Sequence, residues 1–231
     1  MKVVGCVMKD EEFARLLNFV RNEIIRAINS FYTYIEIHNQ LASNKALYRK
    51  LNRNPSFWNI VLHSLQNTFF ITLGRIFDDK SENSVHKLVG VCLANPHLFS
   101  KESLARRRMK AGKRPQWLDG FLLTAFEPSG EDLRVFRRQV SRLRKIYNAV
   151  YGEIRNKVIA HSEFSDSNRV SQLFSKTQVG KIDELLYGLH DVVSVLWELL
   201  DNGKRPEFGV QVYDYKDHIS KTVGDVLSAF R

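Results

Sequence analysis

The sequence predicts an all-α fold. Apolar residues recur at three- and four-residue steps through most of the 231 residues, which is the periodicity of helices with one buried face. Only Glu207–Tyr213 alternates as a strand would, and only weakly. No internal repeat, low-complexity tract or clear linker divides the chain. We therefore expect one helical domain over residues 1–231, interrupted by an irregular basic insertion at about 96–130.

The first third of the chain predicts two long helices and a short one between them. The apolar positions of Asp10–Ser43 keep helical spacing, and the acidic residues of its first turn suit the helix dipole. A shorter helix is expected over Lys45–Leu51. Pro55 then suits the start of the next helix. The segment Phe57–Phe77 is apolar on more than one face, so we expect it to be the central buried helix.

The middle of the chain is basic. A short helix over Val85–Ala94 is stopped by Asn95-Pro96. Residues 101–114 contain seven basic residues and one acidic residue, and we expect a short helix followed by an exposed loop. This run is either a solvated face without a partner or a patch that binds successive phosphates of a nucleic-acid backbone. Gly120–Gly130 is expected to be irregular.

The last part of the chain predicts three more helices. A long helix begins at Glu131-Asp132 and buries residues spaced three or four apart, while a row of basic residues lies on another face. A helix from Thr177 to about Asn202 ends at Gly203. Tyr215–Phe230 forms the last helix.

Composition and charge restrict the function. The formal net charge of +10 attracts polyanions, with nucleic acid the first candidate and an anionic membrane the second. A basic surface that serves only solubility is the alternative.

The two cysteines, far apart and in apolar sequence, do not form a zinc motif or a disulfide framework. No Walker or dinucleotide-type glycine loop, no His-Glu-x-x-His and no Gly-x-Ser-x-Gly motif occurs, so we expect no metal and no cofactor. Without a signal peptide or a long apolar run, the protein is expected to be soluble and cytoplasmic.

One segment near the end of the long basic helix carries residue types suited to RNA cleavage. Arg155, Asn156 and His161 stand within seven residues. Cleaving RNA without a metal requires a group that takes the 2′-hydroxyl proton and donors for the charge that develops on the phosphate oxygens. Histidine titrates near neutral pH and can act as base or acid, and an arginine fork matches phosphate. Asn156 can orient either group or bind an oxygen.

The bare pattern has a structural alternative. His161 can be a histidine that the helix dipole favours at a helix end, with Arg155 in a surface ion pair with Glu153 or Glu163. Five residues separate Arg155 from His161, so their side chains would point apart on an ideal helix. They converge only if the helix ends before His161 or if a second subunit contributes.

The segment Arg155-Asn156-Lys157-Val158-Ile159-Ala160-His161 resembles the Arg-polar-x4-His signature of the HEPN superfamily, in the form found in its abortive-infection branch. Leu73–Asp78 is similar to a recurrent segment of that branch. The resemblance implies an HEPN-like antiparallel helical bundle with additional helices and a basic insertion. It also implies a homodimer that sets two signature segments side by side, and metal-independent endoribonuclease activity in phage defence and toxin–antitoxin systems. By this resemblance Arg155 and His161 would be catalytic and Asn156 would support them.

Two functions therefore remain open. The first is a homodimeric, metal-independent endoribonuclease that acts on RNA, with an antitoxin or regulatory protein as a further partner and no membrane contact. The second is a non-catalytic helical module that binds nucleic acid or a nucleotide. In either case the residues expected to hold the RNA backbone are basic and lie in the insertion and along the long helix: Arg106, Arg107, Arg108, Lys110, Arg134, Arg138, Arg142 and Lys145.

Overall fold

The computed structural model describes residues 8–109, 112–154 and 179–230, and throughout these residues the only regular elements are helices. Their order along the chain is α1 (Asp10–Ser43), α2 (Lys45–Leu51), α3 (Pro55–Ile76), α4 (Val85–Ala94), the 3-10 helix η1 (Pro96–Phe99), α5 (Lys101–Arg108), α6 (Leu118–Thr124), α7 (Gly130–Ile154), α9 (Val179–Asn202) and α10 (Tyr215–Ser228). The predicted all-α fold is confirmed.

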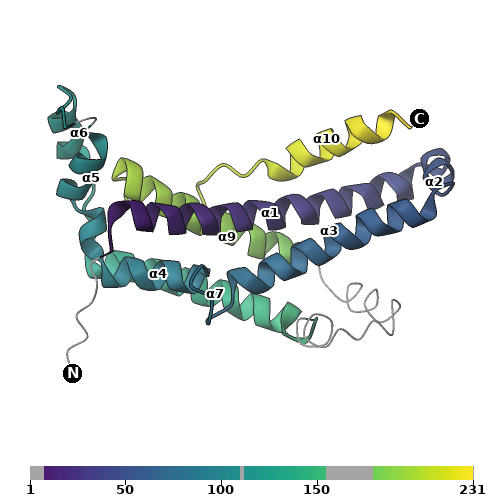
Figure 1. The fold of residues 1–231 in the computed structure, drawn as a ribbon, viewed down its shortest axis with the longest axis horizontal. Coiled ribbons are helices and arrows are strands. Elements are labelled where there is room, and N and C mark those ends of the chain that lie inside the picture. The colour runs from purple at the N-terminus through teal and green to yellow at the C-terminus, as the bar shows by residue number, and fades with distance from the viewer. Residues whose placement is uncertain (1–7, 110–111, 155–178, 231) are drawn as a thin grey trace.

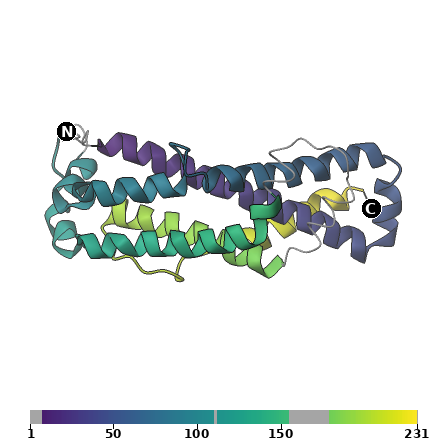
Figure 2. The same ribbon diagram turned by 90° about the horizontal axis from the view of Figure 1, so that it is seen from below.

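The long helix α1 runs the length of the molecule, and the other helices lie along it (Figure 1). α3, α9, α10 and α4 all pack against α1, and α7 packs between α9 and α4. The view from below shows α7 and α4 alongside each other at the end where α1 begins (Figure 2). Acidic residues fill the first turn of α1, where the positive end of the helix dipole favours them.

The buried helix at the centre of the bundle is α9. More than half of its residues are buried, among them Leu185, Leu189 and Leu196, which are fully inaccessible. Burying an aliphatic side chain of this size stabilises a fold by roughly 1.5–3 kcal/mol. α7 supplies the neighbouring stripe of buried residues. Five of them are spaced three or four apart as the sequence predicted: Leu133, Phe136, Val140, Leu143 and Tyr147. Tyr151 extends the stripe by one more turn, which the sequence did not predict.

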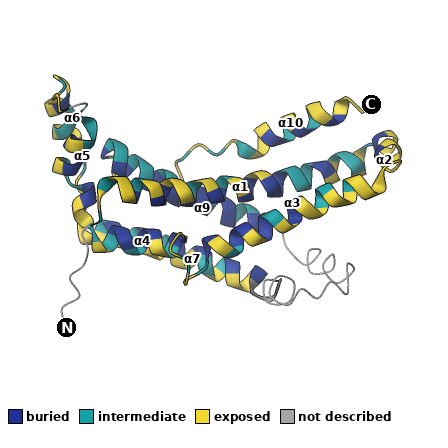
Figure 3. Ribbon diagram, in the orientation of Figure 1, coloured by how far each residue is buried: buried dark blue, intermediate teal, exposed yellow. Residues whose placement is uncertain are grey.

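The prediction that Phe57–Phe77 is the central buried helix is wrong for the first half of α3. Burial begins at Gln66 and is restricted to the second half, whereas Phe57 and Ile60 are 59% and 66% exposed. The first half of α3 lies with α2 and the end of α1 in an arm that extends past α7 (Figures 1 and 3). The first half packs against the core only through partly buried residues such as Trp58 and Leu62, whereas in the second half Phe69 and Phe70 contact Tyr151 of α7.

The expected basic insertion is more regular than predicted. Residues 96–130 contain η1, α5 and α6, which form the end of the molecule beside the start of α1 (Figure 1). The short helix expected within 101–114 is α5. The expectation that Gly120–Gly130 is irregular is wrong as far as Thr124, because α6 continues to that residue. Glu207–Tyr213 forms turns and bends instead of the weakly predicted extended piece.

Candidate functional site

The signature segment begins one residue beyond the described part of α7, the long basic helix that the sequence predicted. The structure describes this helix as far as Ile154. Arg155, Asn156 and His161 lie outside the described residues, so their roles stay predictions. The described part of α7 and its neighbours define the surface from which the signature segment continues.

The exposed face of α7 carries a row of basic residues around a shallow depression of about 490 Å³. Its lining consists of Arg134, Arg137, Arg138, Ser141, Arg142 and Lys145. Every one of these residues is exposed. Steps of three and four residues place them on one side of the helix, opposite the buried stripe. We call this set the α7 row; it contains four residues of the predicted RNA-contacting set and adds Arg137.

Two carboxylates moderate the charge of the α7 row without neutralising it. Glu131 accepts hydrogen bonds from Arg138 at 2.6 Å and from Arg134 at 2.8 Å. Glu184 of α9 accepts one from Arg142 at 3.0 Å. These pairs are open to solvent, and the hydrogen bonds of Arg138 and then Arg134 lower the pKa of the Glu131 carboxyl. Exposed pairs of this kind contribute little to stability and separate readily when a phosphate competes.

The arginines of α5 lie elsewhere and have different neighbours. Arg107 is 16% exposed; one of its terminal nitrogens donates to Asp10 at 3.0 Å and to the Leu98 carbonyl at 2.8 Å, and the other donates to the Leu200 carbonyl at 2.7 Å. Burial lowers the pKa of Arg107, while the Asp10 carboxylate acts in the opposite direction. Arg107 therefore joins the start of α1 to the end of α9, where the negative end of the helix dipole favours a cation.

The two neighbouring arginines complete this structural cluster. Arg106 donates through two nitrogens to one oxygen of Asp10, at 2.9 and 3.1 Å. Arg108 binds the carbonyl and carboxylate of Asp201 at 2.6 and 2.8 Å and also Asn202 at 2.8 Å. Lys110 lies outside the described residues. The structure thus places Arg106, Arg107 and Arg108 together, but at the end of the bundle and in contact with protein acceptors.

The buried end of α7 carries polar groups that the sequence did not assign. Tyr151 is 1% exposed, stacks on Tyr147, and its hydroxyl has no hydrogen-bond partner within the described part of the chain. Burial raises the pKa of Tyr151, and that of Tyr32 is raised by burial to about 12. The Tyr213 hydroxyl donates to Tyr32 at 3.1 Å. These phenols stay neutral at physiological pH. We assign Tyr151 to the core because it is buried and stacks on Tyr147.

The acidic pair Asp78-Asp79 is placed beside α7. Both oxygens of Asp79 accept hydrogen bonds from Arg144, and His86 lies 3.3 Å from the same guanidinium. Arg144 is therefore not part of the α7 row. Arg75, in the recurrent segment, pairs at 2.7 Å with the buried Glu23. No group of three or more His, Cys, Asp or Glu side chains in residues 8–109, 112–154 and 179–230 is placed to hold a metal ion.

The all-helical fold and the Arg-Asn-x4-His sequence that comes after the described part of α7 both agree with an HEPN-type protein. The family model of AbiU2, an HEPN family, matches residues 10–226. The chain therefore belongs to the HEPN AbiU2 family, whose members are abortive-infection proteins. Membership suggests a phage-defence HEPN domain.

No curated protein and no solved structure matches the chain. None of the described helices combines the length and the apolar character that a membrane span requires.

Proposed function

We propose that the protein is a metal-independent endoribonuclease of toxin or phage-defence type, with a composite Arg/His site at a homodimer interface. The observation that carries the proposal is the position of the signature Arg155-Asn156…His161 immediately after a helix whose exposed face is the α7 row. Family membership agrees with this function at the level of phage defence. The α7 row offers an RNA strand a line of cations that leads toward the signature.

In this proposal the signature residues divide the chemistry. His161 removes the proton of a 2′-hydroxyl, and the resulting oxygen attacks the adjacent phosphorus. The bond from phosphorus to the 5′-oxygen breaks, and that oxygen takes a proton from protonated His161. The products are a 2′,3′-cyclic phosphate and a free 5′-hydroxyl. Arg155 stabilises the charge on the phosphate oxygens, and Asn156 orients these groups.

A second copy of the chain would complete the site. The spacing of Arg155 and His161 places them well apart on one helix, so two chains supply the needed convergence most simply. In this proposal the exposed apolar residues Phe57 and Ile60, one turn apart on the arm, would be covered by the second copy. An acidic antitoxin that covers the α7 row would then act as an inhibitor.

A cleavage assay in excess chelator tests the activity. The wild-type protein should cut single-stranded RNA and leave a cyclic phosphate. His161→Ala should lower the rate by about 100-fold or more, because a general acid or base contributes at least that factor. His218→Ala provides the matched control, since His218 is an exposed histidine of α10.

Two outcomes would contradict the catalytic proposal. One is a wild-type protein that cuts no RNA, and the other is a His161→Ala variant that cuts as fast as wild type. Salt-sensitive RNA binding without turnover, unchanged by His161→Ala, would instead establish the non-catalytic binding module.

A further inference from the structure

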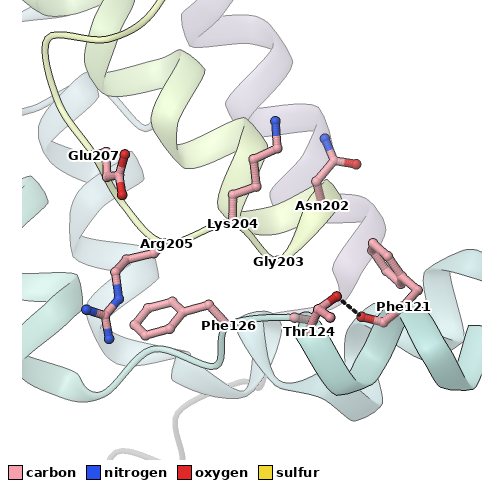
Figure 4. A pocket seen from close by; sticks show the side chains of 9 residues that line it. Phe121, Thr124, Phe126, Asn202, Gly203, Lys204, Arg205 and Glu207 are labelled. Atoms are coloured by element: carbon pink, nitrogen blue, oxygen red, sulfur yellow. Dashed lines mark hydrogen bonds between the residues drawn. The ribbon is translucent and has the colours of Figure 1, made fainter.

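An open depression of about 910 Å³ lies at the end of the bundle where α7 begins. It forms where α6 and the residues after it meet the chain that leaves α9. Its lining consists of Phe121, Thr124, Ala125, Phe126, Asn202, Gly203, Lys204, Arg205 and Glu207. Figure 4 shows Phe126 beside Arg205 on one side of Gly203 and Phe121 with Thr124 on the other. None of these residues was predicted from the sequence to belong to a functional site.

The floor of the depression is fixed by the backbone. The Phe126 amide donates to the Gly203 carbonyl at 2.7 Å. Gly203 ends α9 with φ +59°, and a Cβ there would lie 2.8 Å from the Ala125 Cβ and 2.9 Å from a Leu104 methyl carbon. Only glycine fits this conformation and this approach. The depression is therefore formed before any ligand arrives.

The walls combine cations with aromatic rings. The Arg205 guanidinium carbon lies 4.7 Å from the centre of the Phe126 ring. Arg205 is exposed, and within the described ranges no carboxylate forms an ion pair with it. Lys204 is 66% exposed and pairs with Glu198 at 2.9 Å. Phe121 faces Trp117, with ring centres 5.8 Å apart, and Trp117 is itself exposed.

The depression lies beside the first turns of α7, where Phe136 packs against Phe208, the residue after Glu207 of the lining, with ring centres 5.3 Å apart. Asp132, in the first turn of α7, has its pKa lowered chiefly by hydrogen bonds from Ser129 and additionally by the charge of Arg205. Arg134, the first cation of the α7 row, stands two residues further on. From Arg134 to Lys145 the row covers about 16 Å, at 1.5 Å per helical residue. A strand that follows the row from Lys145 to Arg134 would reach the end of the bundle where the depression lies.

We propose that the depression binds an unpaired base of a single-stranded RNA, stacked against the Arg205–Phe126 pair, while Lys204 and Arg205 hold the adjoining phosphates. Bases that are not paired stack on aromatic rings and on guanidinium planes, and cations follow the backbone. Glu207 at the rim accepts hydrogen bonds from exocyclic amines of a base. The site would bind the strand at the end of the bundle where α7 begins. This proposal rests on RNA being the ligand of the proposed function.

Binding of a strand that cannot be cleaved tests this site separately from catalysis. The probe is a fluorescein-labelled 2′-O-methyl oligoadenylate of about 12 nucleotides, followed by anisotropy at low salt. Phe126→Leu should weaken binding about tenfold and leave the salt dependence unchanged, because stacking releases no counterions. Arg205→Gln should weaken binding and lower the slope of log K against log salt by about one. Lys221→Gln, which removes an exposed cation of α10, is the matched control and should bind as wild type.

The outcomes separate the two proposals. If the wild-type protein binds no strand, the proposed function fails together with this site. If wild type binds and both folded pocket variants bind equally well, the depression serves another partner and only this inference is overturned. If adenosine monophosphate binds the depression as tightly as the oligomer does, the ligand is a free nucleotide and the strand grip is wrong. Thermal unfolding of each variant shows whether the fold is retained.

Discussion

Two carboxylates, Asp10 and Glu131, each lie between two arginines. The arginines at Asp10 hold parts of the fold together, whereas those at Glu131 remain accessible to a ligand. Asp10 at the start of α1 binds Arg106 and Arg107, and its side chain is only 16% exposed. Glu131 at the start of α7 binds Arg134 and Arg138 with its side chain 61% exposed. Asp10 joins elements that are distant in sequence, whereas Glu131 pairs with arginines of its own helix. Arginine content alone therefore does not identify a binding surface.

The two sites differ because their arginines are hydrated to different extents and have different numbers of hydrogen-bond acceptors in the protein. At Asp10, Arg107 also binds two backbone carbonyls, so its buried guanidinium has acceptors on several sides. At Glu131 the arginines keep most of their hydration and lose little when the pair separates. A phosphate can replace Glu131 as the partner of Arg134 and Arg138 at small cost. It cannot draw Arg107 away from its partners without loosening the end of α9.

The largest expected effect comes from Arg107→Ala. Removing this side chain leaves Asp10 with one arginine and two carbonyls without a donor, which should lower the free energy of unfolding by about 2–3 kcal/mol. Urea unfolding measures the loss. Arg106→Ala is the matched control, because Arg106 is 56% exposed and its loss leaves Arg107 on Asp10. A stable Arg107→Ala variant that had lost RNA affinity would mean that the arginines at Asp10, and not those at Glu131, bind RNA.

An intermediate effect is expected from Arg138→Gln in the α7 row. Arg138 is 60% exposed and pairs only with Glu131 among the described contacts, so unfolding should change little. RNA affinity at low salt should fall about three- to tenfold, and the slope of log K against log salt should decrease by about one. Titrations at several salt concentrations measure both. Unchanged affinity and slope for Arg138→Gln would remove the α7 row from the RNA-contacting surface.

The sequence predicted local features of this site and missed those that depend on distant partners. The buried and basic faces of α7 follow from spacing within one helix, so Arg134 and Arg138 could be placed on one face without a structure. Two of the partners of Arg107 stand 97 and 93 residues away, at Asp10 and Leu200, and no local pattern indicates them.

The same limit explains two other misses. Phe57–Phe77 is apolar on more than one face, but composition does not reveal that its first half extends into the arm. The depression needs Phe126 and Arg205 together, which are brought close by the contact between Phe126 and Gly203. The available signal was a Lys204-Arg205 pair directly after the glycine that ends a helix.

The smallest expected effect comes from Glu131→Gln. This change removes the carboxylate that competes with phosphates for Arg134 and Arg138, so RNA affinity at low salt should rise about two- to threefold. Because the folded-state pKa of Glu131 is lowered, its contribution to stability is present above the unfolded-state pKa and is lost as pH falls through the folded-state pKa. Unfolding of wild type and Glu131→Gln should therefore converge in acid, and the difference at neutral pH should be small because both partners are exposed. Glu127→Gln, outside the ion pairs of the α7 row, is the control for a loss of negative charge. Equal gains in affinity from both variants would mean that net charge, and not the release of Arg134 and Arg138, sets the binding.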